Sequence, residues 1–357
     1  MRNEKLDIFR GLAMIWVVFN HTTYWLSFFY YPQWQSIAKS MLLMGTQLFF
    51  FIAGASNGMS RKKNVLEFYL IRFKRILVPY WVYAIICIII TSIIKDFESS
   101  AHFFYFIKQA LYSWFIAINH QWAWEGMVTW ALWFIPVYLL VMLLFPFLRM
   151  FFEKITTFKI KIIPLLIFAA LVFLLQFDLG IEENLLKHCK MVSFYGFFTY
   201  LGLFFTNIFK KQRTGIAVIL AFLCIAATTF SILFLNQSPN MQTNKFPPNF
   251  LFLIFSLGFF AVLYIFSNPI VKAITFCRKN IILDWVYTQY VKHGVTIFLF
   301  HSFVFILLLW LKRTFFAGIN QIIVFPIMLL LSITLSAIIG YLFAWVEKIK
   351  LPVFKKK

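Results

Sequence analysis

An arginine and a histidine lie eleven residues apart in the apolar segment LDIFRGLAMIWVVFNH, which runs from Leu6 to His21. In a helix, Arg10 and His21 would be separated by about 16.5 Å and about three turns, so their side chains would share one face. An ionisable side chain within an apolar span is costly, which makes it a candidate for function. A neutral imidazole can accept the proton of a hydroxyl group, and burial favours that neutral form. The spacing therefore indicates a pair that one elongated ligand could contact.

Both residues also have a structural interpretation. Arg10 could anchor the topology of the chain at a membrane boundary, and His21 could be a hydrogen-bonded packing residue. Arg72 and Arg75 pose the same choice, because they lie three residues apart and would share a face at the start of a predicted helix. Guanidinium groups suit phosphate ligands, but cations at this position also follow from membrane topology alone.

Three weaker candidates for substrate binding are Trp133, His301 and Glu125. An interfacial aromatic belt is the simpler interpretation of Trp133, and His301 could be a helix-end residue. Glu125 falls in an outer segment, where an ordinary solvated loop is the simpler interpretation. The four cysteines are scattered and indicate neither a disulfide framework nor a metal site, and no glycine-rich phosphate loop occurs.

These residues must be positioned by membrane-spanning helices. Of the 357 residues, 62% are hydrophobic and 13% are charged, an excess of apolar residues that must face lipid. We expect an all-α polytopic protein with a single transmembrane domain over residues 1–357. About ten segments are apolar and long enough to cross: 11–30, 41–59, 76–94, 127–147, 162–178, 191–209, 215–235, 250–268, 294–311 and 321–345.

The charges predict the orientation. If the segment 103–118 does not cross, both termini lie on one side together with about three quarters of the 33 Lys and Arg residues. If it crosses, fewer than half of them lie there. The positive-inside rule therefore predicts ten helices, both termini in the cytoplasm, and an interfacial or re-entrant segment at 103–126. The net charge of +21 is then explained by topology, and no nucleic-acid partner is expected.

The first-helix pair resembles the signature of the membrane acyltransferase-three family. Four further elements are similar and follow in the family's order: LFFFIAG (48–54), EFYLIRFKRILVPYW (67–81), ALWFIPVYLL (131–140) and FLFHSFVF (298–305). Together they extend over nearly the whole chain. Two of these elements depart from the family pattern, since Ala53 stands where a serine is expected and phenylalanines precede His301 in place of tyrosine or tryptophan.

The resemblance implies transfer of an acyl group, usually acetyl, from a cytoplasmic coenzyme A thioester to a sugar hydroxyl outside the plasma membrane. His21 and Arg10 would be catalytic, with His21 as the general base, and Arg72 and Arg75 would hold the phosphates of the donor. Acyl-CoA would be a substrate, no cofactor would be permanently bound, and the acceptor would be a surface polysaccharide or glycolipid. A transporter with Arg10 and His21 in its path and a helical scaffold subunit are the alternatives.

Overall fold

The protein is described by a computed structural model that covers residues 3–26, 33–61, 64–95, 98–116, 131–177, 180, 182–210 and 213–349. Within these ranges the ordered elements are helices, and no strand occurs. This part of the chain therefore confirms the all-α expectation.

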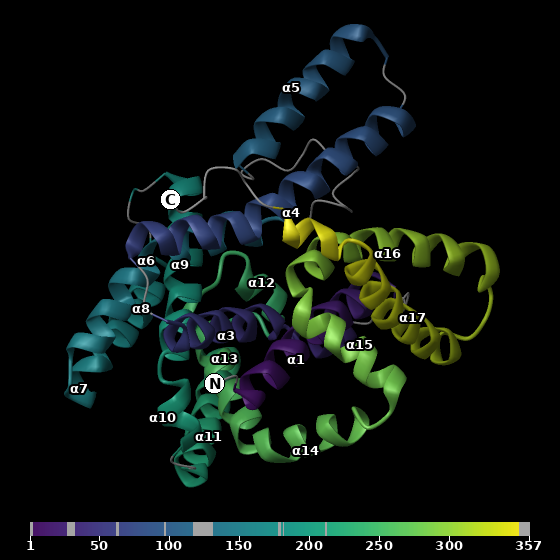
Figure 1. Ribbon diagram of the computed structural model, residues 1–357. Helices are drawn as coiled ribbons and strands as arrows, with labels where there is room; N and C mark the ends of the chain where they lie inside the picture. Colours follow the sequence, from purple (N-terminus) through teal and green to yellow (C-terminus); the bar gives the residue numbers. More distant parts are fainter. Residues whose placement is uncertain are drawn as a thin grey trace. The chain divides into compact units, whose positions relative to one another are not determined.

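The helices differ widely in length (Figure 1). Those of eleven residues or more are α1 (Glu4–Trp25), α3 (Gly45–Met59), α4 (Val65–Ile94), α5 (Ser100–Ile116), α6 (Phe134–Lys154), α8 (Ile163–Leu174), α9 (Glu183–Gly202), α11 (Thr214–Phe234), α13 (Phe250–Ile265), α14 (Ser267–Cys277), α15 (Ile281–Lys292), α16 (Gly294–Phe315) and α17 (Gln321–Leu342). The shorter ones are α2 (Gln33–Ser40), α7 (Phe158–Lys161), α10 (Phe205–Lys210), α12 (Met241–Lys245) and the 3₁₀ helix η2 (Ala344–Lys348).

Six stretches in the described ranges are long and apolar enough to cross a membrane: Ser36–Met59, Val65–Ile94, Phe134–Lys154, Thr214–Phe234, Gly294–Phe315 and Gln321–Leu342. A seventh candidate is the pair α13 and α14, which is bent by 62°. The chain is therefore a polytopic membrane protein. The number of ten spans and the sides of the termini remain predictions.

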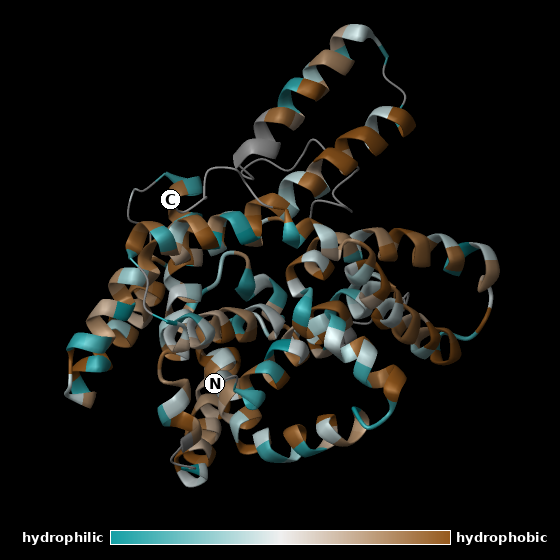
Figure 2. Cartoon of the chain, in the orientation of Figure 1, coloured by the Kyte–Doolittle hydropathy of each residue, from teal (hydrophilic) through white to brown (hydrophobic). Residues whose placement is uncertain are grey.

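Several of these helices are covered by the protein only in part. In α11, 22% of the apolar window is buried, and Phe222 and Leu233 are 71% and 66% exposed. Hydrophobic residues also predominate along α16 and α17 (Figure 2). Apolar side chains of this size are stable in contact with lipid, so these surfaces are suited to the hydrocarbon region.

The described structure divides into two compact units. Unit 1 comprises residues 1–20, 29–62 and 140–284, and unit 2 comprises residues 21–28, 63–139 and 285–357. The two units alternate along the sequence, so α1, α6 and α15 each contribute residues to both. The prediction of one transmembrane domain is not tested by this division.

In unit 1, two glycines allow α3 and α9 to pack closely. A Cβ atom on Gly54 would overlap the carbonyl oxygen of Thr199, and one on Gly202 would overlap the carbonyl oxygen of Phe51. Small residues let helix backbones approach closely in membrane proteins. Gly54 closes the LFFFIAG element noted in the sequence, so its role there is packing.

Replacing Gly54 with alanine is expected to destabilise the protein, because the new methyl group meets backbone atoms that cannot rotate away. The expected cost is about 1–3 kcal/mol, typical of overpacking. Gly215 provides the matched control, since a Cβ atom there meets no atom within 4 Å. Thermal unfolding of the detergent-solubilised variants measures both effects. Equal midpoints for the two variants would show that the close contact of α3 with α9 is not needed.

The segment 236–249 contains the short helix α12 and a set of asparagine side chains. The side chain of Asn240 accepts a hydrogen bond from the backbone of Gln242 at 2.9 Å and donates one to Ser36 at 3.1 Å. Lys245 is buried here, and burial lowers its pKa to about 8 because it penalises the ammonium charge. The segment is therefore an ordered connection, which its Pro and Asn content alone does not predict.

In unit 2, α16 and α17 form an antiparallel pair (Figure 1). A Cβ atom on Gly340 of α17 would overlap the side chain of Ile297, so glycine permits close packing here too. The end of α1 is attached to this pair, because Thr22 and Ser332 share a hydrogen bond of 2.6 Å. The Lys312 ammonium group also donates to the carbonyl oxygen of Leu26. These bonds fix the position of the residue before Thr22, which is His21.

Candidate active site

The expected pair on the first helix is found on one element. Helix α1 begins at Glu4, earlier than the apolar span predicts, and continues without interruption through Arg10 and His21. Glu4 and Asp7 lie in its first turn, where carboxylates interact favourably with the helix dipole. The early start therefore has a local cause.

The imidazole of His21 lies against that of His301, which comes from α16. Nδ1 of His21 and Nε2 of His301 are 2.7 Å apart, and the two rings are stacked with centroids 4.9 Å apart and planes 17° apart. His301 is completely buried and His21 is half-buried. His301 is the eighth residue of α16, so its interpretation as a helix-end residue is wrong.

Aromatic rings surround this histidine pair. The ring of Phe305 stands edge-on to both imidazoles, with centroid distances of 6.2 Å to His21 and 5.2 Å to His301. Phe298 lies 5.9 Å from His301 by the same measure. The phenylalanines that replace the expected tyrosine or tryptophan before His301 therefore include an apolar neighbour of the site. An apolar wall of this kind strengthens the hydrogen bonds that it encloses.

Arg72 and Arg75 belong to the same unit as the histidine pair. They lie on α4, whose first turn is capped by Asn64, and Arg72 sits 5.7 Å from the ring of Phe68. The charges of both arginines act on Tyr138, a buried residue of α6. Both cations therefore lie close enough to one buried side chain to influence it electrostatically. Tyr138 was not a site candidate in the sequence, because an aromatic residue in an apolar helix is ordinarily a packing residue.

Aromatic contacts join α4, which carries these arginines, and α6 to α16, which carries His301. Tyr83, eight residues beyond Arg75 on α4, lies 5.1 Å from Phe300 and 5.5 Å from Phe303 by ring centroids. Eight helical residues span about 12 Å. On α6, the ring of Phe134 lies 5.5 Å from Tyr138 and 4.9 Å from Phe298. Both α4 and α6 thus contact α16 beside His301.

Arg10 makes two side-chain contacts within unit 1. Its guanidinium group donates to Asp7 at 2.7 Å and to Ser56 of α3 at 2.8 Å. The side chains of Arg10 and Asp7 are 31% and 15% exposed. Arg10 therefore ties α1 to α3, and its charge is balanced in part by a carboxylate that the sequence pattern did not single out.

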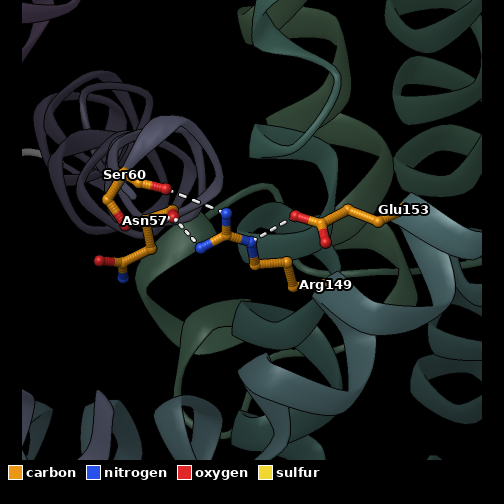
Figure 3. Close-up of polar contacts among 4 residues, drawn as sticks. All are labelled: Asn57, Ser60, Arg149 and Glu153. Atoms are coloured by element: carbon orange, nitrogen blue, oxygen red, sulfur yellow. Dashed lines mark hydrogen bonds and ion pairs between the residues drawn. The ribbon is translucent and has the colours of Figure 1, made fainter. Parts of the chain in front are cut away.

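A second oriented arginine in unit 1 was counted in the sequence only as a topology charge. Arg149 of α6 donates to the backbone carbonyl oxygens of Asn57 and Ser60, each at 3.0 Å, and to Glu153 at 2.7 Å (Figure 3). The last carbonyl groups of a helix lack helical donors, so Arg149 satisfies those at the end of α3. Its role here is to hold that helix end.

Trp133 and Glu125 are the remaining candidates from the sequence. Trp133 is half-buried, and its ring and that of Phe134 form a T-shaped pair with centroids 6.4 Å apart. Glu125 lies outside the described residues.

Near the start of α16, Thr296 donates to Glu347 at 2.6 Å, and His293 lies 3.5 Å from the same carboxylate. This contact fixes the beginning of the helix that carries His301.

Comparison with known proteins identifies the family. A profile of the acyltransferase domain matches residues 3–341, nearly the whole chain. No curated protein and no solved structure matches the chain. The matched range includes α1, α4 and α16, which carry the histidine pair, Arg72 and Arg75. The chain therefore belongs to the membrane acyltransferase-three family.

Proposed function

We propose that this membrane acyltransferase is an O-acyltransferase of a cell-surface polysaccharide or glycolipid. It takes an acyl group, most simply acetyl, from a cytoplasmic coenzyme A thioester and transfers it to a hydroxyl group on the outer side of the plasma membrane. His21 is the general base, Arg10 completes the catalytic pair, and Arg72 and Arg75 bind the phosphates of the donor.

One observation carries this proposal. A half-buried imidazole, His21, is hydrogen-bonded within the same compact unit that holds two neighbouring arginines. Buried ionisable groups in a membrane protein are costly, and a purely structural helix bundle does not require them. Acyl transfer from an anionic thioester donor to a hydroxyl acceptor needs two groups. One is an imidazole, and the other is a cationic site that binds the anionic donor.

The chemistry balances without a further reactant. The acceptor oxygen attacks the thioester carbonyl carbon, a carbon–oxygen bond forms, and the carbon–sulfur bond breaks. His21 takes the hydroxyl proton during the attack and returns it to the coenzyme A thiolate as that group leaves. The enzyme is unchanged at the end of the cycle.

The dimensions of unit 2 support donor binding in an extended form. Coenzyme A carries its phosphates at one end and its thioester at the other. Arg75 and Tyr83 are about 12 Å apart along α4, and Tyr83 contacts the α16 residue adjacent to His301. Phosphates held at Arg72 and Arg75 would leave the thioester arm free to extend toward the histidine pair.

The topology in this proposal has ten spans and cytoplasmic termini, with the acceptor meeting the donor inside the membrane. Single cysteines introduced in a background without the four native ones test it. Lys62→Cys and Lys211→Cys should react only from the cytoplasmic side, whereas Thr243→Cys, an exposed position on α12, should react from outside. External labelling at position 211 would overturn this topology and make 103–118 a span.

The catalytic proposal is tested on purified protein in detergent. With acetyl-CoA labelled in its acetyl group and a surface glycan fraction as acceptor, label should appear in the glycan and free coenzyme A should accumulate. A folded protein that binds acetyl-CoA but neither transfers nor hydrolyses the acetyl group would contradict the proposal and favour a transporter.

A further inference from the structure

The hydrogen-bond chain that ends at His21 begins at a backbone carbonyl group. Nδ1 of His301 lies 3.1 Å from the carbonyl oxygen of Ile297, one turn earlier on α16. A carbonyl oxygen only accepts, so Nδ1 of His301 must carry the hydrogen atom. His301 is completely buried, and burial penalises the charged imidazolium form. In the neutral ring, Nε2 of His301 is therefore an acceptor.

This assignment determines the tautomer of His21. Nε2 of His301 faces Nδ1 of His21 at 2.7 Å, so Nδ1 of His21 is the donor in that bond. A neutral imidazole carries one hydrogen atom on its two nitrogens, and the lone pair of His21 is therefore on Nε2. The nitrogen that can accept a proton is thus set by a residue on a different helix.

The surroundings also fix the orientation of the ring. Thr22, the next residue on α1, is bonded to Ser332 of α17, which holds the backbone at this point. The edge of Phe305 packs against both imidazoles. Rotation of the His21 ring would break the bond to His301 and leave a buried acceptor without its donor, which costs free energy.

We propose that His301 is a positioning residue that holds His21 in the tautomer whose Nε2 accepts the proton of the acceptor hydroxyl. This inference rests on the proposed function of His21 as the base. When His21 takes the proton, its Nδ1–H bond to His301 becomes charge-assisted and therefore stronger. The third residue of a Ser-His-Asp triad holds its histidine in the same way, with a carboxylate in place of the neutral imidazole.

Three substitutions at position 301 separate positioning from packing. Glutamine can place its amide oxygen where Nε2 of His301 lies, whereas asparagine reaches only the position of Nδ1 and leucine offers no acceptor. We expect His301→Gln to keep kcat within about 3-fold of wild type, and His301→Asn and His301→Leu to lower it about 10-fold or more. The affinity for acetyl-CoA, measured on the same folded samples, should be unchanged in all three.

Other outcomes would overturn the proposal in distinct ways. Wild-type kcat in both the Asn and Leu variants would mean that His301 only packs. Loss of turnover in the Gln variant, with donor binding intact, would mean that His301 itself transfers the proton. If wild-type protein transfers no acyl group, the proposed function fails first, and the positioning role fails with it.

A modified histidine that can adopt only one tautomer gives a second measurement. It does not depend on comparing substitutions at position 301. Nδ1-methylhistidine at position 21 cannot carry hydrogen on Nδ1 and keeps its lone pair on Nε2. In a His301→Ala background the methyl group fits the vacated space, and we expect it to raise kcat above that of His301→Ala with ordinary histidine at 21. An equal or lower kcat would contradict tautomer control by His301.

Discussion

Replacing His21 with alanine is expected to lower kcat for acyl transfer by about 10²–10⁴-fold, the usual contribution of a general base. The protein should still insert and bind acetyl-CoA, because the arginines proposed to bind the donor lie on α4. His301 loses its hydrogen-bond partner in this variant, so a decrease in stability of about 1–3 kcal/mol is also expected. Steady-state kinetics on purified, folded protein measure the effect.

Glutamine at the same position removes the base while keeping a polar side chain of similar size. His21→Gln cannot accept a proton at neutral pH, so its turnover should be as low as that of His21→Ala. His102 supplies a control, since it is an exposed histidine on α5 and His102→Ala should behave as wild type. Near-normal turnover of His21→Gln would contradict the proposed role of His21 as the base.

Substitution of Arg72 or Arg75 by glutamine is expected to weaken coenzyme A binding while the fold is retained. Each charge-assisted bond to phosphate contributes about 1.5–3 kcal/mol, which corresponds to an increase in Kd of about 10- to 150-fold. The effect should appear in the Kd and in KM for the donor more than in kcat. Equilibrium binding of acetyl-CoA at fixed salt concentration gives this result directly.

Lys74 is the matched control for the arginine variants. It lies between them on α4 but projects from a different face, because neighbouring helical residues are about 100° apart. Lys74→Gln removes one positive charge from the same helix and should change the affinity little. A decrease equal to that of the arginine variants would mean that only the overall positive charge matters, and Arg72 and Arg75 would then be topology residues.

The features that could be predicted from the sequence were those with a local cause. Hydropathy and the lack of a strand pattern indicated a helical membrane protein, and the spacing of Arg10 and His21 placed them on one helix, as α1 shows. The spacing of Arg72 and Arg75 likewise indicated a shared face. Each inference needed only helical periodicity and the cost of burying charge.

The contacts that could not be predicted join residues far apart in the chain. His21 and His301 are separated by 280 positions, and nothing in either segment specifies the other as its partner. The same holds for Arg10 with Ser56 and for Arg149 with the end of α3. Such pairs depend on how the helices pack, and periodicity within one helix carries no information about its neighbours.

The central claim is that this protein acylates a surface glycan with His21 as the base, and one comparison of cells tests it most directly. Surface polysaccharides and glycolipids are isolated from cells that make wild-type protein, no protein, or His21→Gln at equal membrane abundance, and their masses are measured. We predict an added acyl group, most simply acetyl, only in the wild-type sample. Equal acylation in the wild-type and His21→Gln samples, or glycans of identical mass in all three, would contradict the account.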